Sequence, residues 1–196
     1  MEKLKLWTIQ DKAAYDKFQK TGVLRADSNF AMFDYSWMAK QMIARIGPPP
    51  TGVTEPVWAW HSWEGECKPS ITEDDIKNSR VVIEFTIDSD KVLLSDFDAW
   101  HAVLMFDYLA LTAEEYADFE DQVYYSDYTW DDIIHSGNSD DNLKALQDKL
   151  SESWVRIFDI KSNHIFREPD IGASIQATFW ELRIDQVTKV TFLGGN

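Results

Sequence analysis

Patterns typical of β-strands stand at both ends of this chain, and helical patterns fill the length between them. The N-terminal run KLKLWTIQ (3–10) alternates apolar and polar residues, and RVVIEFTI (80–87) is rich in β-branched residues. The chain closes with two further runs, IQATFWELRI (175–184) and VTKVTFL (187–193). This order predicts a single α+β domain, in which a mostly antiparallel mixed sheet has flanking helices.

Shorter segments connect these runs. Further strands are expected at VWAWHSW (57–63), KVLL (91–94) and WVRIFDI (154–160). Apolar residues recurring every three or four positions predict helices over 11–22, 30–46, 95–108, 112–136 (in two pieces) and 143–154. The second of these helices ends at GPPPTG (47–52), because its three prolines cannot continue a helix.

Acidic residues are concentrated in one part of the chain. The net charge is −15, and residues 88–141 contain 15 aspartates and glutamates against one base, Lys91. We therefore expect residues 96–152 to form an acidic helical insertion. Direct binding to nucleic acid is disfavoured, because it requires a basic face. An acidic face suits solubility, a basic protein partner, or imitation of nucleic acid.

Two features that the sequence lacks, a second cysteine and a long apolar segment, limit the class of protein. Cys67 is the only cysteine, so the chain can build neither an internal disulfide nor a thiolate metal cage. No window approaches 18 apolar residues, and the N-terminal residues lack the apolar core of a signal peptide. We expect a cytoplasmic protein that does not enter a membrane.

The stretch PVWAWHSWEGEC (56–67) places three tryptophans and a histidine within six residues. On a strand, Trp58 and Trp60 share one face, and His61 lies on the other. The two tryptophans can stack on a planar ligand or fill the core beneath the helices. Core filling is the favoured interpretation, and His61 is interpreted as incidental.

The segment LLSDFDAWH (93–101) offers a possible acid–base group. Asp98 and His101 are three residues apart and can meet on one helix face, where the carboxylate would orient the imidazole. The alternative, which we favour, is that Ser95 or Asp96 simply caps the helix. No metal site is assigned here, because two acids two residues apart diverge on a helix.

A third candidate lies in the late run TFWELRI (178–184), where Glu181 shares a strand face with Phe179. There it could be a catalytic carboxylate whose pKa is raised by burial. The favoured alternative is a cross-strand pair with a base such as Lys189 on a solvent face.

Several phrases together resemble the bacterial domain of unknown function DUF3841. They are LWTIQ (6–10), TGVLRAD (21–27), IGPPPTGV (46–53), PVWAWHSW (56–63), VLLSDFDAWHAVL (92–104), SWVRIFDI (153–160) and QATFWELRIDQV (176–187). The resemblance spans nearly the whole chain and implies a family without implying an activity.

The order of elements also resembles that of ADP-ribosyltransferase-like domains, with a first strand, a helix ending in glycine, an aromatic strand and a late strand carrying glutamate. That resemblance implies NAD as the cofactor and Glu181 as the catalytic carboxylate. The first strand departs from the pattern, because it offers Thr8 and Gln10 where a histidine or arginine would hold NAD.

Two hypotheses follow. In the first, the protein binds a small molecule or nucleotide in a pocket at the sheet ends. The more specific version of this hypothesis is an ADP-ribosyltransferase-like activity. Trp60, Gln10, Ser95 and Asp96 would then contact the ligand, and the catalytic residues would be Glu181, His101 and Asp98. In the second, it is an acidic interaction protein that binds a basic partner or imitates nucleic acid. Whether the chain is an enzyme is left open.

Overall fold

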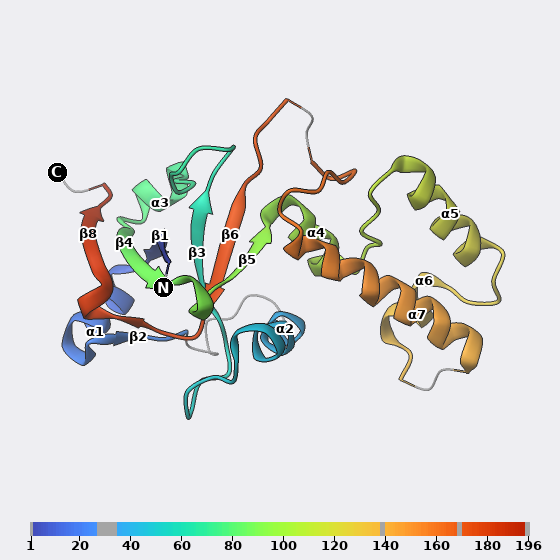
Figure 1. The fold of residues 1–196 in the computed structure, drawn as a ribbon, viewed down its shortest axis with the longest axis horizontal. Coiled ribbons are helices and arrows are strands. Elements are labelled where there is room, and N and C mark those ends of the chain that lie inside the picture. Colours follow the sequence, from blue (N-terminus) through green and yellow to red (C-terminus); the bar gives the residue numbers. More distant parts are fainter. Residues whose placement is uncertain (1, 27–34, 138–139, 168–169, 195–196) are drawn as a thin grey trace. The chain divides into compact units, whose positions relative to one another are not determined.

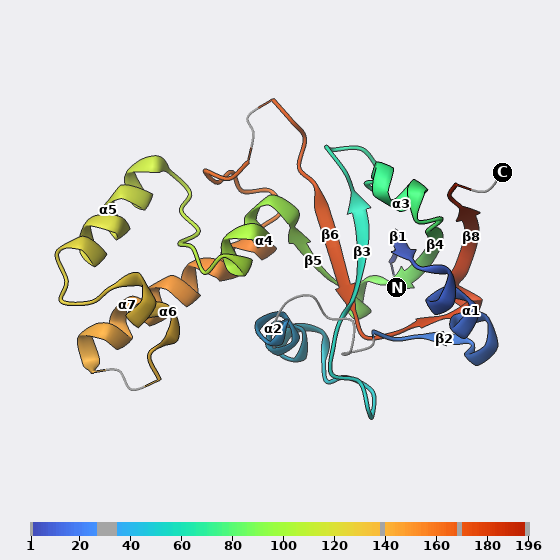
Figure 2. The same ribbon diagram turned by 180° about the vertical axis from the view of Figure 1, so that it is seen from behind.

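The chain folds into two compact units. The structure is a computed structural model that describes residues 2–26, 35–137, 140–167 and 170–194. Unit 1 comprises residues 1–94 and 174–196, and unit 2 comprises residues 95–173 (Figure 1). Strands gather in unit 1 and helices in unit 2, as the reverse view also shows (Figure 2). The predicted α+β class is confirmed.

A six-stranded sheet has the strand order β5-β6-β3-β1-β4-β8. Its strands are β1 (Lys3–Gln10), β3 (Val57–Ser62), β4 (Val81–Asp88), β5 (Leu93–Asp96), β6 (Ile175–Phe179) and β8 (Val187–Phe192). The pairings of β1 with β3 and β4, of β3 with β6, and of β4 with β8 are antiparallel. A second, small sheet pairs β2 (Val23–Leu24) with β7 (Leu182–Arg183).

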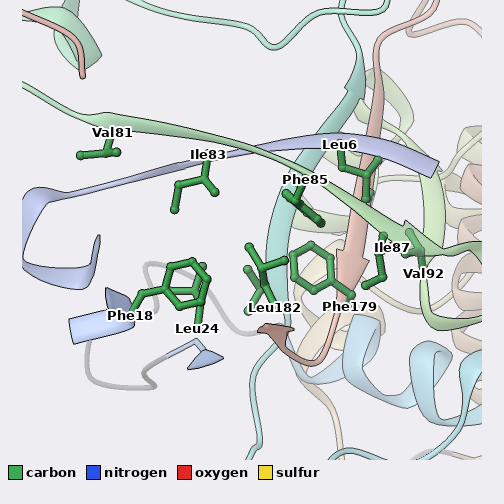
Figure 3. Packing of buried hydrophobic residues seen from close by; sticks show 13 residues of the cluster. Leu6, Phe18, Leu24, Val81, Ile83, Phe85, Ile87, Val92, Phe179 and Leu182 are labelled. Atoms are coloured by element: carbon green, nitrogen blue, oxygen red, sulfur yellow. The ribbon is translucent and has the colours of Figure 1, made fainter. Parts of the chain in front are cut away.

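The core of unit 1 lies on one face of the large sheet. Alternate residues of the central strands, such as Leu6 and Phe85, are fully buried there. Phe85 meets Phe179 edge to face, with ring centroids 5.2 Å apart. Phe18 of the helix α1 (Lys12–Thr21) and Leu182 of β7 complete this layer (Figure 3). The helix and the small sheet therefore cover the core face.

The helices of unit 1 begin and end where local chemistry allows. The Asp11 side chain accepts a hydrogen bond from the Ala14 N–H at the start of α1, and Gly22 ends that helix in the left-handed region at φ 73°. The other helices are α2 (Ser36–Ile46) and α3 (Glu73–Lys77), with 3₁₀ turns at Ser89–Lys91 and Ile184–Gln186. Phe30 and Phe33, expected to begin the second helix, lie outside the described residues.

In its described part, unit 2 begins with the last two residues of β5 and continues as helices and loops. The helices are α4 (Phe97–Leu104), α5 (Ala113–Tyr124), α6 (Trp130–His135) and α7 (Asp141–Ser153), followed by the 3₁₀ helix Trp154–Phe158. Its interior includes Phe119 and Leu109, which are fully buried, and Tyr108 stacks on Phe119 with centroids 4.2 Å apart. The two helical pieces expected within 112–136 are confirmed as α5 and α6.

Two local predictions were wrong. Trp154–Phe158 forms a 3₁₀ helix, not a strand, because Trp154 and Ile157, three residues apart, are the buried pair. The prediction that Ser95 or Asp96 caps the helix α4 is confirmed, and the capping residue is Asp96, whose side chain accepts from the Ala99 N–H. The run 175–184 breaks at Trp180, so the expected alternation around Glu181 is interrupted.

The two tryptophans of β3 face away from the core of unit 1. The strand is an inner one, as predicted, between β6 and β1. Its core residues are Val57 and Ala59, whereas Trp58 and Trp60 are only half-buried. The interpretation that this tryptophan pair fills the core was therefore wrong, because the small residues occupy the face beneath the helix.

Candidate functional site

A groove of about 770 Å³ lies in unit 1 beside the end of β1. Gln10 lines it from the last position of β1, and Phe18 from α1. Leu24 of β2 adds apolar surface, while Arg25 and Thr54 add polar groups. A groove of this size with an apolar floor and a few polar groups is typical of small-ligand sites.

The small sheet brings Arg25 and Glu181 together across 156 positions of sequence. Leu24 pairs with Leu182 in the antiparallel ladder, so the next positions along it are Arg25 and Glu181. Arg25 donates to Glu181 Oε2 from Nη2 at 2.9 Å and from Nε at 3.1 Å. The glutamate is therefore paired with a base at the wall of the groove, although with Arg25 and not with the expected Lys189.

Gln10 is fixed by a short chain of hydrogen bonds. Its Nε2 donates to Thr8 Oγ1 at 2.7 Å, and the Thr8 hydroxyl donates to the carbonyl of Trp58 at 2.8 Å. Thr8 is fully buried, so this chain anchors the end of β1 to β3. Gln10 therefore presents a positioned amide beside the groove.

Trp60 lies on the opposite face of the sheet from Gln10. It pairs with Trp7 in register, and Trp7 and Gln10 are three residues apart on β1, so their side chains point to opposite faces. The Trp60 ring contacts Trp63 edge to face at 5.0 Å. Trp60 and Gln10 therefore do not line one cavity, and contact of Trp60 with a ligand stays a prediction.

Glu84 lies at the centre of this second face. It accepts hydrogen bonds from Trp7 Nε1 at 3.1 Å and the Thr188 hydroxyl at 3.0 Å, and Lys5 Nζ is 3.0 Å away. Burial alone would raise the pKa of Glu84, but these partners hold it below its usual value. A small cavity of about 160 Å³ lies beside it, bordered by Lys189. These three partners of Glu84 all belong to strands of the sheet.

In unit 2, Asp96 is the centre of a buried polar cluster. Only 1% of Asp96 is exposed, and its carboxylate caps α4. Arg167 Nη2 donates to Oδ2, and His164 Nε2 lies 3.2 Å from Oδ1, although the angles do not make the latter contact a hydrogen bond. Burial would raise the pKa of Asp96, but His164, the Ala99 N–H and Arg167 together hold it below its usual value.

Asp98 differs from its neighbour. Burial and the nearby charge of Asp96 raise the pKa of Asp98. His101 is exposed, its Nδ1 lies 3.0 Å from the carbonyl oxygen of Phe97, and its ring packs edge to face on Phe97 at 4.7 Å. Within the described residues, no ion pair joins Asp98 to His101, so the expected dyad is not formed in this structure.

The remaining predicted residue, Ser95, is fully buried, and its hydroxyl makes no hydrogen bond within the described part of the chain. The sequence prediction missed His164 and Arg167, which come from a loop about 70 positions away. No local pattern marks them, because they meet Asp96 only through the fold. A catalytic role for Asp98 or His101, and a ligand contact for Ser95 or Asp96, stay predictions.

No group of three or more potential ligands among the described residues is placed to hold a metal ion. The same residues contain no helix of sufficient length and apolarity to cross a bilayer. The predicted sites thus fall into two sets, with Gln10, Trp60 and Glu181 in unit 1 and the segment from Ser95 to His101 in unit 2.

A comparison with protein families identifies the chain. The family model described as a domain of unknown function (DUF3841) matches residues 5–188. The chain belongs to this family. No curated protein and no solved structure gave a match. The DUF3841 match therefore confirms the resemblance in sequence, and any activity has to be argued from the geometry.

Proposed function

We propose that this DUF3841 protein binds a small organic ligand of about nucleotide size in the groove of unit 1. The observation that carries the proposal is Arg25, held by Glu181 at the wall of a groove of about 770 Å³. Small-ligand sites usually have volumes of roughly 300–1,000 Å³.

The chemistry of the groove favours a ligand with a flat apolar part and an anionic group. Ala13, Ala14 and Val23 offer accessible apolar surface, and Gln10 offers an amide. Arg25 uses Nε and Nη2 for Glu181, and within the described residues its Nη1 makes no hydrogen bond. A guanidinium fixed in this way is well suited to a phosphate or carboxylate, because its planar donors match their oxygens.

The sharper form of the proposal is that the ligand is NAD and that Glu181 takes part in chemistry. In that reaction the bond between nicotinamide and ribose breaks, nicotinamide leaves, and a nucleophile attacks the ribose carbon. The Glu181 carboxylate would stabilise positive charge that develops on the ribose. The location of Glu181 beside Arg25, in the same unit as Gln10, supports this form.

Binding is tested by calorimetric titration of the purified protein with NAD, ADP-ribose and AMP. Arg25→Ala should weaken binding at least about tenfold, since it removes a charge-assisted contact of roughly 1.5–3 kcal/mol. Lys91→Ala is the matched control, because Lys91 is exposed and lies near the strand end opposite to Gln10. Equal binding by the parent protein and Arg25→Ala, or no binding of any of the three ligands, contradicts the proposal.

Catalysis is tested separately by measuring nicotinamide released from NAD. Glu181→Gln keeps the shape of the side chain and should abolish release while NAD affinity changes less than about threefold. If affinity falls as far as in Arg25→Ala, Glu181 acts by positioning Arg25 and the catalytic form is wrong. If no nicotinamide is released although NAD binds, the protein is a binding protein only.

A further inference from the structure

Unit 2 carries nearly all of the net charge of the protein. Residues 95–173 contain 18 acidic and five basic residues, a net charge of −13 out of −15 for the whole chain. Unit 1, with more residues, is close to neutral. The excess charge is therefore a property of one structural unit, and its distribution within that unit can be traced to particular helices.

The helix α5 has two contrasting faces. Phe119 and Val123 are buried against the rest of unit 2. The helix lies beside α7 in both views (Figures 1 and 2). On the side of α5 away from its buried residues, all side chains are exposed. We define the acidic–aromatic face as the exposed residues Glu114, Asp118, Asp121, Tyr124 and Tyr125.

The acids of this face are not used by the fold. Among the described residues, the carboxylates of Glu114, Asp118 and Asp121 make no ion pair or hydrogen bond. Glu114 and Asp118 are four residues apart, and Asp118 and Asp121 are three apart, so like charges are neighbours on the helix surface. Such pairs destabilise a helix, and α5 contains no lysine or arginine to offset them.

A lysine that contacts α5 is engaged elsewhere. Lys149 of α7 donates to Gln122 Oε1 at 2.8 Å. Its ammonium also lies 5.5 Å from the ring centre of Phe119 and 6.0 Å from that of Tyr108. Lys149 therefore covers the inner side of the helix and does not neutralise the acidic–aromatic face.

Two aromatic rings continue this face. Tyr124 is 79% exposed and Tyr125 is 80% exposed, and their rings meet edge to face at 5.1 Å. Asp121 lies one turn before them and Asp127 follows two residues after Tyr125. Adjacent exposed tyrosines flanked by carboxylates are unusual for a surface that serves solubility alone, because aromatic rings are enriched at protein interfaces.

We propose that the acidic–aromatic face docks an arginine-rich segment of another protein. A guanidinium can stack on a tyrosine ring while it pairs with a neighbouring carboxylate, and here Asp121 and Asp127 flank the two tyrosines. The face extends about 16 Å along α5, which matches about five residues of an extended peptide. A nucleic acid or a second copy of this chain would bring negative charge against negative charge. This inference does not depend on the ligand groove of unit 1.

Arginine is favoured over lysine for a physical reason. The planar guanidinium is weakly hydrated and stacks on aromatic faces, whereas the lysine ammonium is a strongly hydrated point charge. An arginine-rich peptide should therefore bind at least about threefold more tightly than a lysine peptide of the same length and charge. Raising salt from about 50 to about 300 mM should weaken binding at least about tenfold, because the charges are exposed.

The experiment uses fluorescence anisotropy of labelled arginine and lysine peptides with the full chain. Replacing both rings, Tyr124→Ser with Tyr125→Ser, should weaken the arginine peptide about fivefold and remove its advantage over lysine. Replacing two of the three acids, Asp118→Asn with Asp121→Asn, should weaken both peptides. The matched control is Glu2→Gln with Glu73→Gln, which removes two exposed carboxylates from unit 1 and should leave binding unchanged.

The outcomes separate the proposal from its alternatives. Circular dichroism and urea denaturation should confirm that all variants fold, since each change is at an exposed position. The proposal is overturned if the tyrosine variant binds the arginine peptide as tightly as the parent. It is also overturned if the control variant loses as much affinity as the α5 acid variant, because binding then follows net charge alone. Self-association of the parent that the tyrosine variant abolishes would identify a second copy as the occupant instead.

Discussion

Glu115 and Arg156, 41 positions apart in the sequence, form a hydrogen-bonded ion pair of 2.6 Å within unit 2. The same carboxylate accepts from the Tyr108 hydroxyl at 3.0 Å and the Leu111 N–H at 2.8 Å. Arg156 also donates to the carbonyl of Leu109 at 2.8 Å. The hydrogen bond from Arg156 is the main cause that lowers the pKa of Glu115 to about 2. This pair joins α5 to the 3₁₀ helix that follows α7.

This lowered pKa predicts a specific dependence of stability on pH. Glu115 keeps its charge more readily in the folded state, so its contribution is present above its unfolded pKa and is lost as pH falls toward about 2. Glu115→Gln should reduce the free energy of unfolding at neutral pH by on the order of 2 kcal/mol, after discounting for partial exposure. Urea denaturation at several pH values should show this difference shrinking below about pH 4.5. A difference that stays constant with pH contradicts the assignment.

The buried pair of Asp96 and Arg167 gives a second prediction. Asp96→Asn retains a residue that can cap α4, but it leaves the Arg167 guanidinium without its carboxylate. The free energy of unfolding should fall by about 3–5 kcal/mol, as expected when one partner of a buried ion pair is removed. Urea denaturation measures the loss. Double replacement with Arg167→Met should recover part of it, and a double variant no more stable than Asp96→Asn would count against the pairing as its cause.

Asp98 should behave in the opposite way from Asp96, although the two are only two residues apart. Its pKa is raised by burial and by the charge of Asp96, so ionisation of Asp98 costs folding free energy at neutral pH. Asp98→Asn should therefore leave stability unchanged or increase it at pH 7, and the increase should vanish below the unfolded pKa. Nuclear magnetic resonance titration of the Asp98 carboxyl checks the direction directly, and a pKa below the ordinary aspartate value contradicts it.

Elements defined by local periodicity could be predicted from the sequence, and those that depend on distant partners could not. The end of α1 at Gly22 and the pair α5 and α6 followed from caps and helical spacing. The segment 154–160 misled because its apolar residues satisfy both a two-residue and a three-residue spacing. Only burial of Trp154 with Ile157 decides between them in favour of the 3₁₀ helix.

The candidate sites divide in the same way. Asp96 and Asp98 stand out in the sequence because they are neighbours at a helix start. Arg25, the partner of Glu181, and Arg167, the partner of Asp96, leave no local signal, because each pair forms across more than 70 positions. Ion-pair partners that are distant in the sequence are brought together by strand register and by the packing of loops. A single sequence contains no local pattern that reveals either.

The face of the large sheet that supports the core can be tested by substitutions in β6 and β3. Phe179 is fully buried in the core layer, where it meets Phe85, whereas Trp60 is half-buried on the other face of the sheet. Phe179→Ala should cost about 3–5 kcal/mol in the free energy of unfolding, because it removes buried surface and leaves a cavity. Trp60→Ala should cost less, on the order of 2 kcal/mol, although tryptophan is the larger residue. Urea denaturation of both variants decides between the faces. A larger loss for Trp60→Ala would mean that the tryptophan face is the principal core of unit 1.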